Sequence, residues 1–413
     1  MRIIQLIKNA LIIWYLRVRY KMTLFKLRKE VRREGFVQVY FFVSEIAKWK
    51  AQSLYDLMEL DKRFVPVICI YPMGIESGDD NHILTLLSEK ESFFQNKNMR
   101  VTNIWDVKNK CIDMSLFKTK GIIFYQQPWD VPPAPTPLQV SRNWLTFYFP
   151  YYLVNNYAKT LELYKRLQRH IFRYIVPSED IKNFYYKEVC RYAFAGEIVG
   201  LGHPCVDYLI STKRTNMGFT VIYAPHFSFP VKSMNRPLYY STFLDNGEFI
   251  LNYAKKHPEI KWVFKPHPRL KSELEITGVW SKAKIQDYYD EWEKLGEACY
   301  TSDYQSLFVN SDVMITDCGS FLSEYACTRN PIVRMVLPGL NILPHPALEE
   351  LYSTYYCVCN NDELEDVFDM LLVKRNDPKK ELRNKAIDKI EFCNNSSAER
   401  ILEYISNMLK FRQ

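Results

Sequence analysis

The chain has 413 residues, 47% of them hydrophobic, and a formal net charge of +8. This length and composition supply apolar cores for two ordinary domains, which excludes a disordered protein. The ten cysteines include one close pair, Cys357-Val-Cys359, and no Cys-x-x-Cys or Cys/His cluster with zinc spacing. We therefore expect neither a metal nor another cofactor, and scattered thiols without a secretory signal predict a reducing cytoplasm.

Most of the net charge lies in residues 1–33, which carry ten basic side chains and a single acid, Glu30. The rest of the chain keeps 45 of the 55 basic and 46 of the 47 acidic side chains, so it is nearly neutral. A neutral globular part offers no broad footprint for nucleic acid, and we expect no nucleic-acid partner.

Residues 1–34 are predicted to form a basic amphipathic helix. Its apolar residues recur at helical spacing as one stripe flanked by cations: Ile4, Ile7, Leu11, Trp14, Tyr15, Val18, Met22 and Phe25. The longest uncharged run, residues 9–16, is far shorter than the roughly 20 residues of a membrane span. The helix lies either in the interface of an anionic membrane or on its own domain. We expect the first, and with it a cytoplasmic protein held peripherally at the inner face of the cell membrane.

From residue 36 onward, buried strands rich in Val, Ile, Tyr and Phe alternate with helical patterns. The first set of strands is 36–43, 64–71, 121–127, 172–178 and 197–204, and the second is 219–225, 261–266, 312–317, 331–337 and 355–359. Alternation of this kind predicts an α/β fold of two doubly wound, Rossmann-like domains that face a cleft.

The predicted domains are 35–210 and 211–390, joined near residues 207–218. Helices are expected at 45–60, 242–256, 321–328 and 362–372. The stretch from about Pro378 to Leu409 reads as one long helix, and residues 391–413 are expected to pack back on the first domain.

Two motifs directly follow strands of the second domain. In "YAPHFSF", His226 and Ser228 follow Pro225, and in "KPHPR" the residues Lys265, His267 and Arg269 alternate in an extended segment. Alternate residues of an extended segment point largely the same way. Two cations beside a histidine predict an anion site with a proton carrier.

Two further motifs belong to the same edge of the sheet. In "SDVMITDCGSFLSEY" a strand ends at Asp317, Gly319 permits a tight turn, and Ser320 is the expected N-cap of a helix that contains Glu324. Free N–H groups at the start of that helix predict a phosphate seat. In "YTSDYQSLF", Asp303 precedes a short helix. His203, His257 and His345, all before prolines, are expected in loops.

The second half resembles the CDP-glycerol glycerophosphotransferase family, the teichoic-acid primases and polymerases and their capsule-building relatives. The resemblance rests on the order of "IYAP", "FKPHP" and "SDVMITDCGSFLSEY" followed by "NPIV", and it covers about residues 197–340. It implies a two-domain, GT-B-like glycosyltransferase fold. It also implies transfer of a polyol phosphate from a CDP-linked donor to a hydroxyl of a membrane-anchored acceptor, with release of CMP.

By position, the resemblance makes His267 the family's functional histidine and places Gly319 and Ser320 on its phosphate-contacting Ser-Ser pair. Asp303 falls where the family also has an aspartate. Cys318-Gly319-Ser320 stands where the family has Tyr-Ser-Ser, so one hydroxyl contact is lost. The Trp-His-Gly motif that supplies a second histidine in the polymerases is absent, which leaves the base for the acceptor open, with His226 as the candidate.

The resulting hypothesis is a phosphoryl transfer in which the protein positions the reactants and stabilises charge. His267 hydrogen-bonds the transferred phosphate or protonates the leaving CMP, and His226 or a group of the first domain deprotonates the acceptor. The expected donor site comprises Lys265, Arg269, Ser228, Asp303, Asp317, Gly319, Ser320, Phe321 and Glu324.

Three alternatives stay open. A glycosyltransferase using a CMP-activated or other nucleotide-activated sugar would share the release of a nucleotide. A sugar epimerase on the same architecture would not need the N-terminal helix. A non-catalytic scaffold of a surface-polysaccharide assembly complex would bind no cytidine nucleotide.

Overall fold

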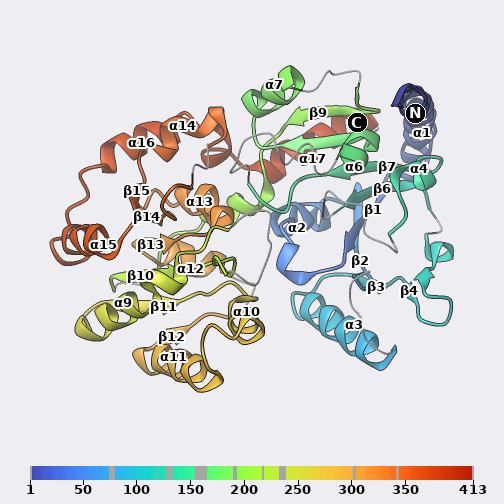
Figure 1. Cartoon of the computed structure of the whole chain (residues 1–413). Coiled ribbons are helices and arrows are strands. Elements are labelled where there is room, and N and C mark those ends of the chain that lie inside the picture. The colour runs from blue at the N-terminus through green and yellow to red at the C-terminus, as the bar shows by residue number, and fades with distance from the viewer. Residues whose placement is uncertain are drawn as a thin grey trace. The chain divides into compact units, whose positions relative to one another are not determined.

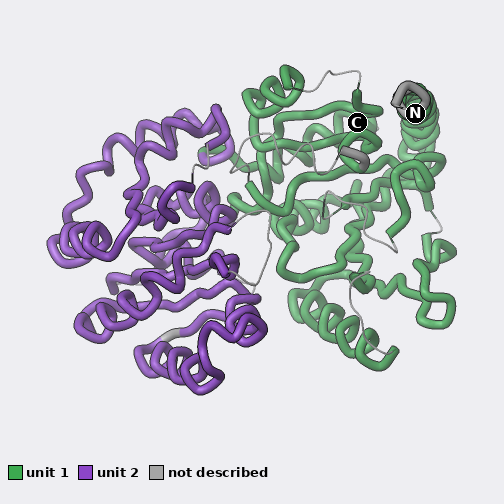
Figure 2. Tube along the Cα trace, in the orientation of Figure 1, with its two compact units in different colours: residues 1–153, 158–207, 394–413 green, residues 154–157, 208–393 purple. Residues whose placement is uncertain are grey.

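The computed structural model describes residues 2–73, 80–117, 119–125, 127, 134–153, 165–188, 193–215, 218–231, 239–300, 304–340 and 344–411. The chain divides into two compact units (Figures 1 and 2). Unit 1 comprises residues 1–153, 158–207 and 394–413, and unit 2 comprises residues 154–157 and 208–393. Asp303 and most of the segment 126–133 lie outside the described residues.

Unit 1 is built on a parallel sheet of order β3-β2-β1-β6-β7-β8-β9. Its strands are β1 Val37–Val43, β2 Phe64–Ile70, β3 Val101–Asn103, β6 Gly121–Tyr125, β7 Trp144–Tyr148, β8 Arg173–Val176 and β9 Glu197–Gly200, with the short antiparallel pair β4 Trp105–Asp106 and β5 Cys111–Ile112 beside it. Its helices are α1 Arg2–Glu34, α2 Gln52–Leu60, α3 Asp80–Gln95, α4 Pro137–Val140, α6 Lys165–His170, α7 Glu179–Glu188 and α17 Ser397–Leu409. Because β6 and β7 are buried along their whole length, they read as continuous apolar runs.

Unit 2 has a second parallel sheet, of order β12-β11-β10-β13-β14-β15. Its strands are β10 Thr220–Ala224, β11 Lys261–Phe264, β12 Glu297–Ala298, β13 Val313–Thr316, β14 Ile332–Met335 and β15 Tyr356–Val358. Its helices are α9 Phe243–Lys256, α10 Leu270–Thr277, α11 Lys282–Leu295, α12 Gln305–Val309, α13 Gly319–Ala326, α14 Glu349–Tyr352, α15 Asn361–Phe368 and α16 Lys380–Asp388, and α8 Asp207–Ser211 leads into the unit. The order of this sheet is that of a dinucleotide-binding Rossmann domain, which confirms the predicted fold class for each unit.

The prediction of one long helix near the C-terminus was wrong. α16 ends at Asp388, and α17 begins at Ser397 after a 3₁₀ turn at Glu391–Cys393. The break has a physical cause, because Ser396 caps α17 by accepting from the N–H of Glu399. The carboxylate of Asp207 also accepts from the N–H groups of Ser397 and Ala398, at 2.8 Å each. These bonds hold the start of α17 in unit 1, where α17 packs against α2.

Strand β7 is not among the strands that the sequence predicts. It is buried along its whole length and pairs with both β6 and β8. The predicted helix at 45–60 is also shorter, with a 3₁₀ turn at Ile46–Lys48 before α2.

The helix α1 packs one face on unit 1. Ile13, Leu16, Tyr20, Leu27 and Val31 are buried in the core that also contains α2 and α17. The hydroxyl of Tyr20 lies 2.6 Å from Thr146 Oγ1 and donates to the carbonyl of His170 at 2.7 Å. None of the helices in the described part of the chain has the length and hydropathy needed to cross a bilayer.

Candidate functional site

The candidate site lies at the carboxyl ends of neighbouring strands of unit 2. β10 stands in the middle of the sheet, with β11 on one side and β13 on the other. The direction of winding reverses between β10 and β13, and ligands of such sheets bind outside the strand ends at that point. The motifs that follow β10, β11 and β13 therefore come together, as their positions after strands indicated.

Two histidines form the centre of this group. The rings of His226, after β10, and His267, after β11, have centroids 4.9 Å apart at an interplanar angle of 65°. Phe227 contacts both, with its centroid 4.4 Å from each imidazole. The guanidinium of Arg269 lies 4.4 Å from the centroid of the same Phe227 ring. Phe227 thus holds two imidazoles and a guanidinium in one cluster, which we call the histidine cluster.

Asp317 fixes the cluster from β13. Its carboxylate accepts from the N–H of His226 at 2.6 Å and from the N–H of Thr242 at 2.8 Å, so it ties the loop after β10 to the start of α9. The residue is 6% exposed, and this burial raises the pKa of its carboxyl to about 6. Both carboxylate oxygens are engaged by the protein, so Asp317 positions His226. The sequence interpretation had placed it on the donor.

The turn at His267 departs from the expected extended geometry. β11 ends at Phe264, and Arg269 adopts an αR conformation as the N-cap of α10. The alternation therefore stops after His267, because Pro268 begins a turn that leads into the helix. Lys265 is buried at 4% exposure, whereas Arg269 is exposed and forms an ion pair with Glu273.

Three of the four His-Pro dipeptides share one hydrogen bond. Nδ1 of His203, His267 and His345 accepts the backbone N–H of the second residue along, at 3.2, 3.1 and 3.1 Å. An imidazole that accepts at Nδ1 carries its proton on Nε2 when it is neutral. The local turn is therefore structural, and what distinguishes His267 from the other two is the cluster around it.

His267 is held in its neutral form. Burial, with the positive charges of Arg269 and Lys265 next in importance, lowers the pKa of its imidazole to about 4. A neutral ring with Nδ1 already accepting presents Nε2–H as a hydrogen-bond donor. This geometry suits His267 to bind a phosphate oxygen, and an anion bound there would raise the pKa of the ring.

His226 has a different set of partners. Its Nδ1 accepts from the N–H of Ser228 at 3.2 Å and lies 2.8 Å from the Ser228 hydroxyl oxygen. Because a hydroxyl can either donate or accept, the proton of a neutral His226 can sit on Nε2 or on Nδ1. In the second arrangement Nδ1–H donates to Ser228 Oγ and no longer accepts the N–H of Ser228, and Nε2 can take a proton from a substrate. Ser228 is 4% exposed, and its Oγ also accepts from the N–H of Tyr240 at 3.2 Å.

The helix after β13 begins two residues earlier than predicted. α13 starts at Gly319 with Cys318 as its N-cap, so Ser320 lies in the first turn, and its predicted role as N-cap was wrong. The Ser320 hydroxyl is 2.9 Å from the sulfur of Cys318. Burial raises the pKa of the Cys318 thiol. Gly319 has no positive φ, so a left-handed turn is not what this glycine supplies.

A second group links α13 to β11 through a residue that sequence reasoning overlooked. The hydroxyl of Tyr304 donates to Glu324 at 2.7 Å, and the ammonium of Lys265 lies 5.9 Å from the centroid of the Tyr304 ring. Phe321 packs on the same ring with centroids 5.0 Å apart. Glu324 is 2% exposed, so its carboxylate is held inside this group, away from solvent. Tyr304 stands next to Asp303, and the only signal for it was that neighbour.

In the part of the chain that the structure describes, no three His, Cys, Asp or Glu side chains are grouped as a metal site. His203 and His345 are fully buried in their turns, and His257 ends α9, so all three lie away from regular helix or strand interiors as expected.

Comparisons with known proteins bear on the fold. No family model and no curated protein matches the sequence. A solved variant of the wall teichoic acid polymerase TagF matches with a TM-score of 0.58 at 12% identity, over 96% of this chain and 93% of that one. A UDP-N-acetylglucosamine 2-epimerase matches with a TM-score of 0.55 at 10% identity, over 92% and 97%. The UDP-GlcNAc 2-epimerase from Neisseria meningitidis, bound to UDP-GlcNAc, gives 0.51 at 13% identity, over 90% and 99%.

The fold is GT-B-like. At these identities the likeness concerns the architecture of the chain. It does not choose between a polymerase and an epimerase, so the reaction has to be argued from the side chains of the site.

Proposed function

We propose that the protein is a transferase that uses a cytidine-activated donor, with CDP-glycerol or a related CDP-polyol as the donor and a membrane-anchored polymer or glycolipid as the acceptor. The observation that carries the proposal is the histidine cluster at the switch point of unit 2. Its position is where a Rossmann sheet binds a nucleotide. The cations Lys265 and Arg269 and the N–H groups at the start of α13 suit a diphosphate.

The proposed step is a phosphoryl transfer. The acceptor hydroxyl oxygen forms a bond to the phosphorus that bears the polyol. The bond from that phosphorus to the bridging oxygen breaks, and CMP leaves with the bridging oxygen. Charge on the phosphate oxygens is stabilised by the Nε2–H of His267, the ammonium of Lys265 and the N–H groups at the start of α13.

His226 is the proposed base. It takes the hydroxyl proton at Nε2 while Nδ1–H donates to Ser228 Oγ, which the contact of 2.8 Å permits. Nδ1 of His267 accepts the N–H of Arg269 and so carries no proton, whereas Nδ1 of His226 also has the Ser228 hydroxyl beside it. We therefore assign the base to His226 and phosphate binding to His267, and we place Asp317 in a positioning role.

The proposal includes a peripheral location at the inner face of the cell membrane, where a lipid-linked acceptor would be presented. It is supported by the basic, partly apolar exposed surface of α1.

The experiment is nucleotide release from a panel of CDP-glycerol, CDP-ribitol, CMP-sugars and UDP-GlcNAc, with membrane extract as the source of acceptor. Release of CMP from a CDP-polyol supports the proposal. Consumption of a CMP-sugar would instead make the protein a glycosyltransferase, and conversion of UDP-GlcNAc without nucleotide release would make it an epimerase. If calorimetry detects no binding of a cytidine nucleotide and no compound of the panel is consumed, the scaffold alternative is favoured.

A further inference from the structure

The helix α1 presents two apolar faces. Its buried face packs on unit 1, whereas Ile7, Leu11, Trp14, Val18, Met22 and Phe25 are 40–72% exposed. These six residues recur every three or four positions, so they form one exposed stripe about 27 Å long. The sequence suggested two alternatives, packing on the domain or lying on a membrane. The structure shows the packing and leaves the stripe uncovered in this chain.

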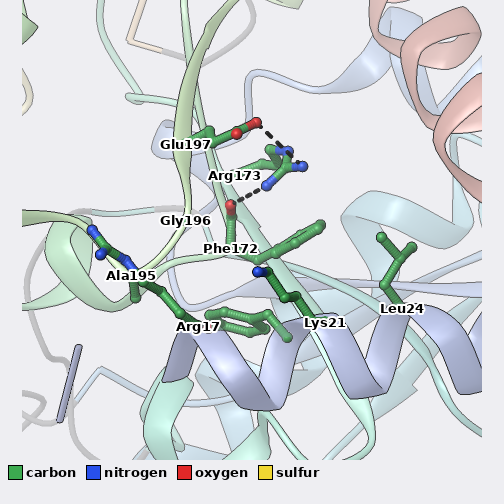
Figure 3. Close-up of a pocket in the computed structure, with 9 residues that line it drawn as sticks. Arg17, Lys21, Leu24, Phe172, Arg173, Ala195, Gly196 and Glu197 are labelled. Carbon is green, nitrogen blue, oxygen red and sulfur yellow. Dashed lines mark hydrogen bonds and ion pairs between the residues drawn. The ribbon is translucent and has the colours of Figure 1, made fainter. Parts of the chain in front are cut away.

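A pocket opens beside the stripe. Its cavity volume is about 470 Å³, which falls within the roughly 300–1,000 Å³ of small-molecule sites. One wall is α1, with Arg17, Lys21 and Leu24. The other wall is formed by the first residues of β8 and β9 and the residues directly before these strands. Figure 3 shows Lys21 extending from α1 toward Phe172 and Arg173, whereas Arg17 extends toward Ala195.

The pocket is positively charged. Three cations, Arg17, Lys21 and Arg173, line it together with one carboxylate, Glu197. Arg17 is anchored, because its Nε and Nη2 donate to the carbonyl of Phe194 at 3.1 and 2.8 Å. Arg173 donates to the carbonyl of Phe172 at 2.9 Å and lies 3.4 Å from Glu197. The two guanidinium groups are therefore held in place before any ligand arrives.

Lys21 connects the pocket to the stripe. Each residue of a helix turns by about 100° around the axis, and in that angle Lys21 lies between Arg17, which lines the pocket, and Val18, which belongs to the stripe. Its side chain is exposed, whereas that of Arg173 is only 13% exposed. A phosphate in the pocket would contact a fixed guanidinium and a lysine that can move to it, while an acyl chain attached to that phosphate continues along the stripe.

We propose that this pocket binds the phosphate headgroup of an anionic phospholipid, with the apolar stripe of α1 inserted in the adjoining acyl region. Two features favour a lipid as the occupant. The cations lie beside the exposed apolar surface, and amphiphiles alone match both parts at once. The proposal concerns unit 1 and does not depend on the reaction of unit 2, so membrane binding and CMP release can fail independently.

The test is flotation of the full-length protein with vesicles of phosphatidylcholine, alone or mixed with phosphatidylglycerol. We expect binding to the mixed vesicles only. Lys21→Gln is compared with Lys26→Gln, which removes the same charge from an exposed position on the other flank of the stripe. One cation near an anionic surface contributes about fivefold in affinity, the loss expected for Lys26→Gln. For Lys21→Gln we expect roughly tenfold or more, because a hydrogen bond to a charged group is lost as well.

Three results would overturn the proposal. Equal losses for the two lysine variants would mean that the charge acts diffusely and that the pocket is no site. Displacement of the protein from vesicles by millimolar inorganic phosphate, with unchanged affinity in a Trp14→Ser/Phe25→Ser variant, would identify a site for free phosphate. If that double variant turns a dimer into a monomer in sedimentation and still floats, the stripe is covered by a second copy of the chain.

Discussion

Exchange of His267 for asparagine separates the turn from the chemistry at this position. In asparagine, Oδ1 occupies the place of Nδ1 and can accept the N–H of Arg269, so the turn keeps the hydrogen bond of 3.1 Å. What disappears is Nε2–H, the group that we assign to the transferred phosphate. Thermal melting of the variant should therefore stay close to that of the wild type, while catalysis falls.

The size of the loss follows from the state of the ring. With a pKa of about 4, His267 is neutral at pH 7 and acts as a hydrogen-bond donor. A hydrogen bond to a charged group contributes about 1.5–3 kcal/mol, so the rate of CMP release should fall roughly 10- to 150-fold.

The assay is kcat/KM for CMP release from the active CDP-polyol between pH 5.5 and 8.5, because this quantity reports the ionisation of the free enzyme. If His267 is neutral and acts only as a hydrogen-bond donor, the wild-type pH profile should show no decrease toward high pH that is missing from the profile of His267→Asn. The reasoning is refuted if the variant turns over like the wild type. It is also refuted if the wild-type rate falls tenfold per pH unit on a limb that the variant lacks, since His267 would then be a general acid.

Three further outcomes are expected. Ser228→Ala removes the hydroxyl that can accept from Nδ1–H of His226, while the backbone N–H of residue 228 still donates to Nδ1 and favours the proton on Nε2. CMP release should fall by at least tenfold in turnover with little change in calorimetric donor affinity, and an unchanged turnover would remove His226 as the base. Tyr304→Phe removes the buried hydrogen bond to the carboxylate of Glu324 and should lower the free energy of unfolding, measured by urea titration, by about 1.5–3 kcal/mol. An unchanged free energy of unfolding would mean that this bond is not formed. Burial lowers the pKa of the His203 imidazole to about 4, so the contribution of its neutral form to stability is complete above pH 6.5 and is lost as the pH falls toward 4. The difference in unfolding free energy between the wild type and His203→Asn should therefore shrink by up to about 3 kcal/mol over that range. A constant difference would contradict the lowered pKa.

The doubly wound architecture was predictable because its strands are short apolar runs separated by helical patterns. β10, β11 and β13 stand near their predicted positions, and the motifs that follow them meet because parallel strands end at one edge. β7 was missed because its five residues directly follow a proline-rich segment and resemble a loop with aromatic side chains. The break before α17 depends on the hydrogen bond from the N–H of Ser397 to Asp207, which is 190 residues away in the sequence. A local sequence pattern cannot predict a bond over that distance.

The candidate site was predictable as a set of motifs, but the roles within it were not. The segment around His267 was expected to be extended, and only the structure shows a turn there whose hydrogen bond recurs at His203 and His345. Asp317 reads as a cleft residue in the sequence, and its use in holding two N–H groups depends on a contact with α9. Tyr304 joins Lys265 to Glu324 through a packing arrangement that no spacing could reveal.

The most direct test of the central claim is CMP release from CDP-glycerol and CDP-ribitol by the full-length wild type, His226→Ala and His267→Asn, with acceptor-containing membranes. The account predicts that the wild type releases CMP from at least one of the two and that both variants lose most of this activity while still melting cooperatively. Release of CMP at an equal rate by all three proteins, or from neither donor by the wild type, would contradict it.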